Sequence, residues 1–216
     1  MKRVIIICEG PTELEFCREI LQPYFLPKNI YIDSPLIKAS KGGIVKWGTL
    51  KKEIQNYLHQ NAIVTTLIDY YGIPDSYNYP AWIEAKEIND KYQRMDFLEQ
   101  EMKNDIPDPL NQNFIPYYQL HEFEGLLFNN IETFDDLFES SELIDREKLL
   151  RDIQDYPNPE LINNDPNTSP SKRLQNYIKG YQKTLYGPMI AEHITLNQIR
   201  QKCTRFNHWI AAIENS

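Results

Sequence analysis

Carboxylate side chains follow two apolar segments that have the composition of buried β-strands. Glu9 comes directly after the run 4–8, and Asp69 comes directly after the run 62–68. Ligands of α/β proteins bind at the carboxyl ends of parallel strands, so we expect Glu9 and Asp69 to face the same crevice. Mg²⁺ prefers oxygen ligands and usually takes one or two carboxylates together with water and phosphate oxygens. The sequence therefore predicts a site for Mg²⁺ or Mn²⁺, and with it phosphate chemistry.

Three further acids are candidate metal ligands. Glu13 lies one helical turn after Glu9 and can face the same space, although an acid is also favourable in the first turn of any helix. Glu122 and Glu124 project to one side if segment 121–128 is extended, whereas a helix would separate them. Asp69 itself has a simpler alternative, as a turn-forming residue.

Basic residues gather at the C-terminal end of an otherwise acidic chain. Segment 171–216 has seven Lys or Arg against two Glu, whereas the whole chain has a net charge of −8. Lys172 and Arg173 open a predicted helix, where the helix dipole disfavours cations, so the pair favours an anion-binding role. Lys183 follows in the same segment. The alternative is that these cations form ion pairs with the acidic part of the chain.

Alternating apolar strands and amphipathic helices predict an α/β fold with a mainly parallel sheet flanked by helices. We expect strands at 3–8, 30–38, 62–69 and 113–120, and helices at 12–22, 45–59 and 83–104. Thr12 is the expected N-cap of the first helix, and Pro23 is expected to stop it. A break is expected at Gly42-Gly43, and a tyrosine-rich loop at 70–81.

The C-terminal part reads as helical. We expect helical pieces over 132–153, a Pro/Asn/Asp-rich connector at 157–170, and helices at 172–185 and 191–214. The spacing of Cys203, Phe206 and Trp209 indicates packing. The expected organisation is therefore an α/β domain at 1–130 with a helical extension at 131–216 packed on it.

Several classes of protein are disfavoured by what the sequence lacks. It has no long apolar run for a membrane span, and its N-terminal apolar run is too short for a signal peptide, so we expect a cytoplasmic protein without membrane contact. Three cysteines at unrelated spacings predict neither a zinc site nor a disulfide framework. Phosphate-loop, dinucleotide-binding and serine-hydrolase motifs are absent, which disfavours ATP hydrolysis, hydride transfer and serine-hydrolase chemistry.

Together these motifs resemble the TOPRIM superfamily, particularly the version in overcoming-lysogenization-defect (OLD) nucleases. The likeness rests on Glu9-Gly-Pro-Thr-Glu13 and on Asp69 as the first acid of an Asp-x-Asp motif. More narrowly, these motifs resemble an uncharacterised bacterial TOPRIM-like family when taken with segment 121–128, Pro-Ser-Lys-Arg at 170–173 and the Cys-x-x-Phe-x-x-Trp ending. Tyr71 departs from the pattern, because it stands where the second Asp would be.

The resemblance implies a TOPRIM-like fold and Mg²⁺-dependent cleavage of phosphodiester bonds in DNA or RNA, in phage defence with a partner ATPase. The expected catalytic residues are Glu9, Asp69, Lys172 and Lys183, and the expected metal ligands are Glu9, Glu13, Asp69, Glu122 and Glu124. Gly10, Tyr71 and Arg173 are expected to bind substrate. A non-catalytic module that binds a partner ATPase or a nucleotide is the alternative, phosphotransfer on a small nucleotide is a third, and homo-oligomerisation is left open.

Overall fold

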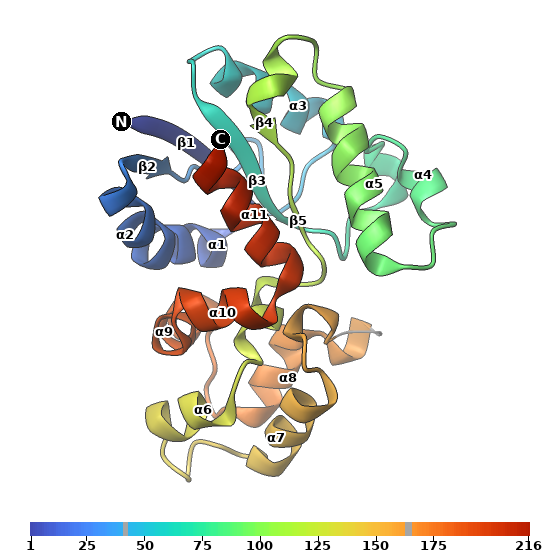
Figure 1. The fold of residues 1–216 in the computed structure, drawn as a ribbon. Helices are drawn as coiled ribbons and strands as arrows, with labels where there is room; N and C mark the ends of the chain where they lie inside the picture. Colours follow the sequence, from blue (N-terminus) through green and yellow to red (C-terminus); the bar gives the residue numbers. More distant parts are fainter. Residues whose placement is uncertain (41–42, 163–165) are drawn as a thin grey trace. The chain divides into compact units, whose positions relative to one another are not determined.

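The computed structural model describes residues 1–40, 43–162 and 166–216. It contains two compact units (Figure 1). The first unit comprises residues 1–120 and 209–216, and the second unit comprises residues 121–208. The sequence predicts a boundary at 130/131 and places the C-terminal end in the second part. In the structure the last eight residues belong to the first unit.

A five-stranded sheet forms the centre of the first unit. Strand β1 pairs in parallel with β2 on one side and with β3 on the other, and β3 pairs in parallel with both β4 and β5. The strands are β1 (Lys2–Cys8), β2 (Ile30–Asp33), β3 (Ile63–Asp69), β4 (Phe114–Ile115) and β5 (Tyr118–Gln119). Residues 4–8 of β1 are completely buried, as expected for a strand covered on both faces. The predicted α/β class and parallel sheet are confirmed.

Helices connect the strands of this unit. The helical segments are α1 (Pro11–Phe16), the π-helical η1 (Cys17–Leu21), α2 (Gln22–Phe25), η2 (Leu26–Lys28), α3 (Trp47–Leu58), η3 (Asp75–Tyr77), α4 (Trp82–Ala85), α5 (Lys91–Asn104) and η4 (Leu110–Asn113). In α3 the apolar face is buried as predicted from its spacing of three to four residues. Helix α11 (Thr204–Asn215) begins in the second unit and ends in the first.

The first helix differs from the prediction at both ends. Its N-cap is Gly10 rather than Thr12. It does not stop at Pro23, because the Gln22 N–H donates to the Cys17 carbonyl five residues earlier and the π-turn changes the helical register. Pro23 then occupies the first turn of α2, where its missing N–H is tolerated.

Three other elements are shorter than predicted. Strand 30–38 ends at Asp33, although Leu36 still forms an isolated parallel bridge with Cys8. Strand 113–120 is divided into β4 and β5 around Pro116, which has no N–H to donate to the sheet. Helix 83–104 is divided into α4 and α5, and Asp90 caps α5 by accepting from the Gln93 N–H. Of the predicted Gly42-Gly43 break, Gly42 lies outside the described residues.

The second unit is helical. Its segments are η5 (Phe123–Leu127), α6 (Ile131–Leu137), α7 (Arg146–Asp155), η6 (Pro159–Leu161), η7 (Pro166–Thr168), α8 (Pro170–Tyr177), α9 (Lys183–Ile194) and α10 (Leu196–Lys202). The predicted helices 172–185 and 191–214 are wrong in extent. Gly180 adopts a left-handed φ of 71° after α8, and Thr195, with a φ of 74°, separates α9 from α10. Part of the predicted connector, residues 163–165, lies outside the described residues.

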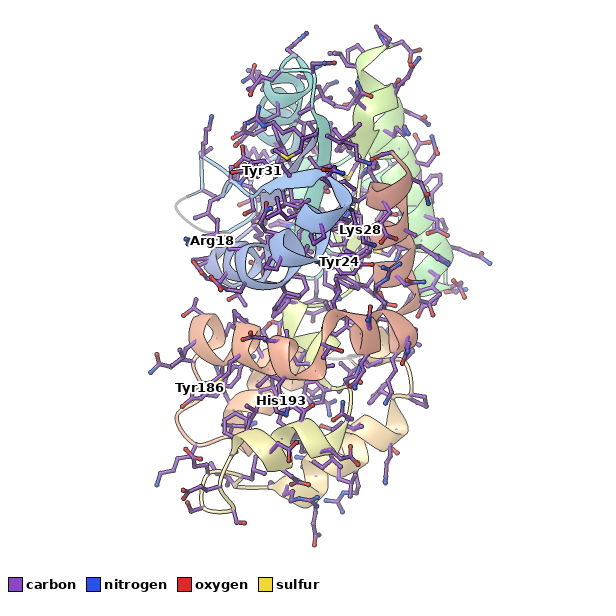
Figure 2. All side chains as sticks on the ribbon, turned by 60° about the vertical axis from the view of Figure 1, so that its left-hand side comes forward. Arg18, Tyr24, Lys28, Tyr31, Tyr186 and His193 are labelled. Carbon is purple, nitrogen blue, oxygen red and sulfur yellow. The ribbon has the colours of Figure 1, made fainter. Side chains whose placement is uncertain are left out.

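The end of α11 is anchored to the first unit. Trp209 stacks on Tyr117 with ring centroids 4.6 Å apart, and its indole N–H donates to the Thr65 hydroxyl at 2.8 Å. Glu214 accepts from the Tyr24 hydroxyl at 2.7 Å and pairs with Lys28, and both of these partners are labelled in Figure 2. Cys203, Phe206 and Trp209 are buried, which confirms their predicted packing role. Among the described residues, no helix is long and apolar enough to cross a membrane.

Replacing Thr65 with Val should destabilise the first unit. The substitution keeps the side chain's shape but leaves the buried Trp209 N–H without its acceptor, at an expected cost of about 1–3 kcal/mol. Urea denaturation followed by tryptophan fluorescence measures the change. Thr49→Val, on the exposed side of α3, is the matched control and should change the unfolding free energy by less than about 0.5 kcal/mol. Equal stability of both variants would contradict the role given to the Thr65–Trp209 bond.

Candidate metal and phosphate site

Glu9 and Asp69 lie together at the carboxyl edge of the sheet. The Cys8–Leu67 register of β1 and β3 brings both chain ends to this edge, and the Glu9 N–H donates to the Leu67 carbonyl at 3.1 Å. The Glu9 carboxylate accepts the Asp69 backbone N–H at 3.0 Å. Both acids are partly exposed. Two carboxylates from segments distant in sequence therefore share one edge.

Glu13 is tied to the same turn through Gly10. Its carboxylate accepts the Gly10 N–H at 2.9 Å, which is the side-chain half of a capping box, and Glu13 is buried. A Cβ on Gly10 would lie 3.1 Å from this carboxylate, so a larger residue there would require the Glu13 side chain to shift by a few tenths of an ångström. The backbone of Gly10 is extended, so its conformation does not require glycine. The helix-capping alternative for Glu13 thus has a direct structural basis.

The tyrosine-rich loop after Asp69 is mostly packed on protein. Tyr70 contacts the rings of Trp82 and Tyr118. Tyr79 is buried, and its burial, followed by the negative charge of Glu9, raises the pKa of its phenol. Tyr71 differs from these two because it is exposed. Of the tyrosines in this loop, Tyr71 is the most exposed.

The donor set of the first unit suits a hard divalent cation. Glu9 and Asp69 supply carboxylate oxygens at adjacent strand ends, and Mg²⁺ commonly needs no more than two carboxylates from the protein. Across residues 1–40, 43–162 and 166–216, however, no group of three His, Cys, Asp or Glu side chains has metal-binding geometry. Water and phosphate oxygens would therefore have to complete the coordination.

Glu122 lies in the second unit and caps a helix. Its backbone is extended, and its carboxylate accepts the Ser171 N–H at 2.9 Å in the first turn of α8. An acid at a helix N-terminus is stabilised by the helix dipole. Glu122 therefore holds the segment that carries Lys172, whose side chain is exposed.

Glu124 is a buried carboxylate of the second unit that forms an ion pair with the partly exposed Lys183. Its carboxylate lies 3.3 Å from the Lys183 ammonium, and its side chain is 3% exposed against 41% for Lys183. Tyr181 is buried beside them. Its burial and the charges of Glu124 and Glu122 raise the pKa of its phenol, so the hydroxyl stays protonated. In this cluster a buried carboxylate is therefore paired with an ammonium group that is partly exposed to solvent.

Arg173 has internal partners. Its guanidinium lies 2.7 Å from the Asp152 carboxylate and also donates to the Thr168 carbonyl at 2.7 Å. The Tyr177 hydroxyl donates to the other Asp152 oxygen at 2.6 Å. Both members of the ion pair are largely buried. Arg173 therefore fits the ion-pair alternative rather than a role in binding substrate.

The predicted residues form two groups. Glu9, Gly10, Glu13, Asp69 and Tyr71 belong to the first unit, whereas Glu122, Glu124, Lys172, Arg173 and Lys183 belong to the second. Sequence reasoning missed Tyr79 and Asp152. Asp152 adjoins buried Ile153 on α7 and lies three residues after buried Leu149, and an acid beside such an apolar stripe was the available signal. Nothing in the sequence of the tyrosine-rich loop distinguishes Tyr79, which is buried, from the other tyrosines of the loop.

A family comparison covers nearly the whole chain. Residues 8–214 match the family described as Domain of unknown function (DUF4276). The chain belongs to this family. No curated protein and no solved structure matches it significantly. The description of this family names no activity, so an inference about function depends on the geometry of the candidate site.

Replacing Asp152 with Asn should destabilise the second unit. The variant leaves the buried Arg173 guanidinium without its counter-ion, and loss of one partner of a buried pair costs about 3–5 kcal/mol. Thermal and urea denaturation measure the effect. Asp135→Asn removes the exposed pair with Arg146 and is the control, with an expected change below about 1 kcal/mol. A similar small loss in both variants would show that the Asp152 network does not support the unit.

Proposed function

We propose that this protein is a divalent-metal-dependent nuclease of the TOPRIM type. The observation that carries the proposal is the hydrogen bond from the Asp69 N–H to the Glu9 carboxylate at the carboxyl edge of a parallel sheet. This edge is where α/β folds bind ligands, and its acids have the chemistry that Mg²⁺ and Mn²⁺ prefer. The resemblance to OLD-type nucleases supports phosphodiester cleavage as the reaction.

Each residue of the first unit has a distinct role in this proposal. Glu9 and Asp69 hold the metal, which when bound activates water and neutralises the leaving oxygen. The Asp69 N–H fixes the orientation of the Glu9 carboxylate. Glu13 fixes the turn at Gly10 and so positions Glu9. The exposed ring of Tyr71 offers a surface on which an unpaired base can stack.

The second unit carries the two cations for which the sequence predicts phosphate contacts, Lys172 and Lys183. Lys183 binds a phosphate oxygen, and its pairing with Glu124 restricts where the ammonium can lie. Lys172 is exposed and adds a contact to the nucleic-acid backbone. Glu122 and Arg173 act as positioning residues, because Glu122 caps α8 and Arg173 braces it through Asp152. The acidic character of the chain suits phosphotransfer on a small nucleotide, the third candidate, better than it suits binding of long duplex DNA.

The biological setting follows from the resemblance alone. Related TOPRIM proteins act with a partner ATPase in phage defence, and we propose the same setting, in the cytoplasm, for this chain. The substrate is DNA or RNA. Self-association is compatible with this proposal and is not required by it.

A binding module is the second candidate function. Two observations favour it: Tyr71 replaces the second acid of the Asp-x-Asp motif, and the described residues contain no three-ligand metal group. In this version the same edge binds a partner ATPase or a nucleotide without cleavage. Metal affinity at Glu9 and Asp69 separates the two candidates.

Glu9→Gln and Asp69→Asn should each abolish metal-dependent cleavage. Both substitutions keep the side-chain shape and remove the charge that a divalent cation requires. We expect wild-type protein to nick plasmid DNA or cleave a single-stranded RNA with Mg²⁺ or Mn²⁺, and both variants to lose at least about 10²-fold in rate. Calorimetric Mn²⁺ titration should show binding to wild type and not to the variants.

Glu19→Gln is the matched control for these variants, because Glu19 is exposed on η1 and should retain full activity and Mn²⁺ binding. Circular dichroism checks the fold of every variant. Full activity of Glu9→Gln and Asp69→Asn would refute the nuclease assignment. Absence of Mn²⁺ binding in the wild type would favour the binding module.

Lys183→Gln should slow cleavage while leaving metal binding unchanged. Removing a cation that stabilises a charged transition state typically costs about 10²–10³-fold in kcat. Single-turnover cleavage and Mn²⁺ titration measure the two effects separately. Lys179→Gln, an exposed site near the start of the same segment, is the control and should behave as wild type. Unchanged kcat in Lys183→Gln would remove Lys183 from the proposed machinery.

A further inference from the structure

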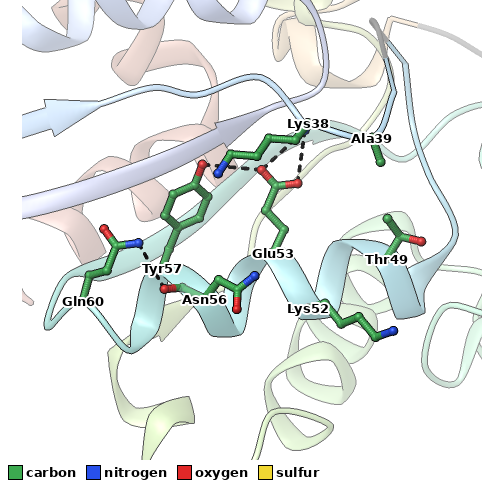
Figure 3. Close-up of a pocket in the computed structure, with 8 residues that line it drawn as sticks. All are labelled: Lys38, Ala39, Thr49, Lys52, Glu53, Asn56, Tyr57 and Gln60. Atoms are coloured by element: carbon green, nitrogen blue, oxygen red, sulfur yellow. Dashed lines mark hydrogen bonds between the residues drawn. The ribbon is translucent and has the colours of Figure 1, made fainter.

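A separate hollow lies on one flank of the first unit, between the chain that follows β2 and helix α3 (Figure 3). Its volume is about 340 Å³, within the range of small-molecule sites. Its lining residues are Lys38, Ala39, Thr49, Lys52, Glu53, Asn56, Tyr57 and Gln60. The α3 residues among them recur every three or four positions, so one helix face forms one wall.

Glu53 is a buried carboxylate that is held by long hydrogen bonds. It is 8% exposed, and it accepts the Lys38 N–H at 3.4 and 3.2 Å and the Tyr57 hydroxyl at 3.5 Å. These distances lie at or beyond the long end for hydrogen bonds. No shorter bond to Glu53 occurs within the described part of the chain. A buried carboxylate with such weak partners still has capacity for strong donors.

The rest of the wall supplies cations and neutral donors. The Lys38 ammonium lies 5.1 Å from the Tyr57 ring centroid, above the same wall. Lys52 is exposed and forms no ion pair with any described residue. The Asn56 and Gln60 side chains add amide groups, and Gln60 also accepts a hydrogen bond from Arg3 at 3.2 Å. The hollow thus combines one buried acceptor with two cations and two side-chain amides.

We propose that this hollow binds a guanine nucleotide. The guanine edge presents two adjacent N–H donors, at N1 and N2, that a single carboxylate can accept together, with the O6 acceptor beside them. Glu53 accepts the two N–H groups, a Lys38 or Asn56 donor contacts O6, and Lys52 contacts the phosphate. Adenine is disfavoured, because its N1 is an acceptor and would face the Glu53 carboxylate.

This site is independent of the proposed nuclease chemistry. It shares no residue with Glu9, Asp69 or the second unit, and its ligand needs no metal. Guanine can come from a free nucleotide or from a nucleic-acid strand, and the chemistry at Glu53 is the same for both. The experiment therefore includes both sources.

The test is calorimetric titration of the full chain with guanosine 5′-monophosphate in EDTA. We expect saturable binding, with adenosine 5′-monophosphate at least about tenfold weaker, since a mismatched edge leaves buried polar groups unpaired. The Glu9→Gln variant should bind guanosine 5′-monophosphate as wild type does, whether or not the nuclease proposal holds. A pentanucleotide with one central guanine that binds tighter than the mononucleotide would identify a strand as the source and would equally support the site.

Variants test the two ends of the ligand separately. Glu53→Gln should weaken binding of guanosine 5′-monophosphate at least about tenfold. Lys52→Glu should weaken the nucleotide but not guanosine, and Lys179→Glu is the charge-matched control. If Glu53→Gln is unfolded by circular dichroism, Lys52→Glu and the adenine comparison still decide the question. Absence of binding at millimolar nucleotide, equal binding of the two bases, or wild-type binding by Glu53→Gln or Lys52→Glu would overturn the proposal.

Discussion

The parallel pairing of β1 with β3 is the constraint on which the candidate site depends. Because the two strands run in the same direction with Cys8 beside Leu67, both chains leave the sheet at one edge and with one register. Glu9 can then accept the Asp69 N–H, so the Glu9 carboxylate is oriented by the end of the neighbouring strand. Shifting either strand by one residue would turn these side chains to opposite faces. The fully buried aliphatic residues of β1 make such a shift costly, so the core fixes the geometry of the acids.

The two central strands, β1 and β3, were the most predictable elements of the fold, because continuous apolar runs such as 4–8 and 62–68 have few other stable locations. The helices were less predictable at their ends. Proline normally ends a helix, because it has no N–H to donate to the preceding turn. A π-turn nevertheless lets this helix continue beyond Pro23. Helix α9 ends where Thr195 adopts a positive φ, and no glycine or proline at this position predicts the end of the helix. Such features depend on tertiary packing that overrides local preference.

The candidate site likewise has a part that could be predicted from the sequence and a part that could not. Glu9 and Asp69 could be predicted as neighbours, since strand direction alone brings them to one edge. The partners of the basic residues could not, because the contacts of Arg173 with Asp152 and of Lys183 with Glu124 join segments with no local relationship. From the sequence, Lys183 is expected to be catalytic and Arg173 to bind substrate, so both are expected to contact the ligand. The structure separates them: one is largely buried in an internal network, and the other keeps part of its surface in water.

The bond between Trp209 and Thr65 has a consequence for how this chain is built. It makes the last eight residues part of the first unit, so the second unit is an insertion that interrupts a single α/β fold between β5 and its final helical turns. A fragment that stops after the sheet would lack the buried side chains of Trp209, Ile210 and Ile213, and with them a piece of its own core.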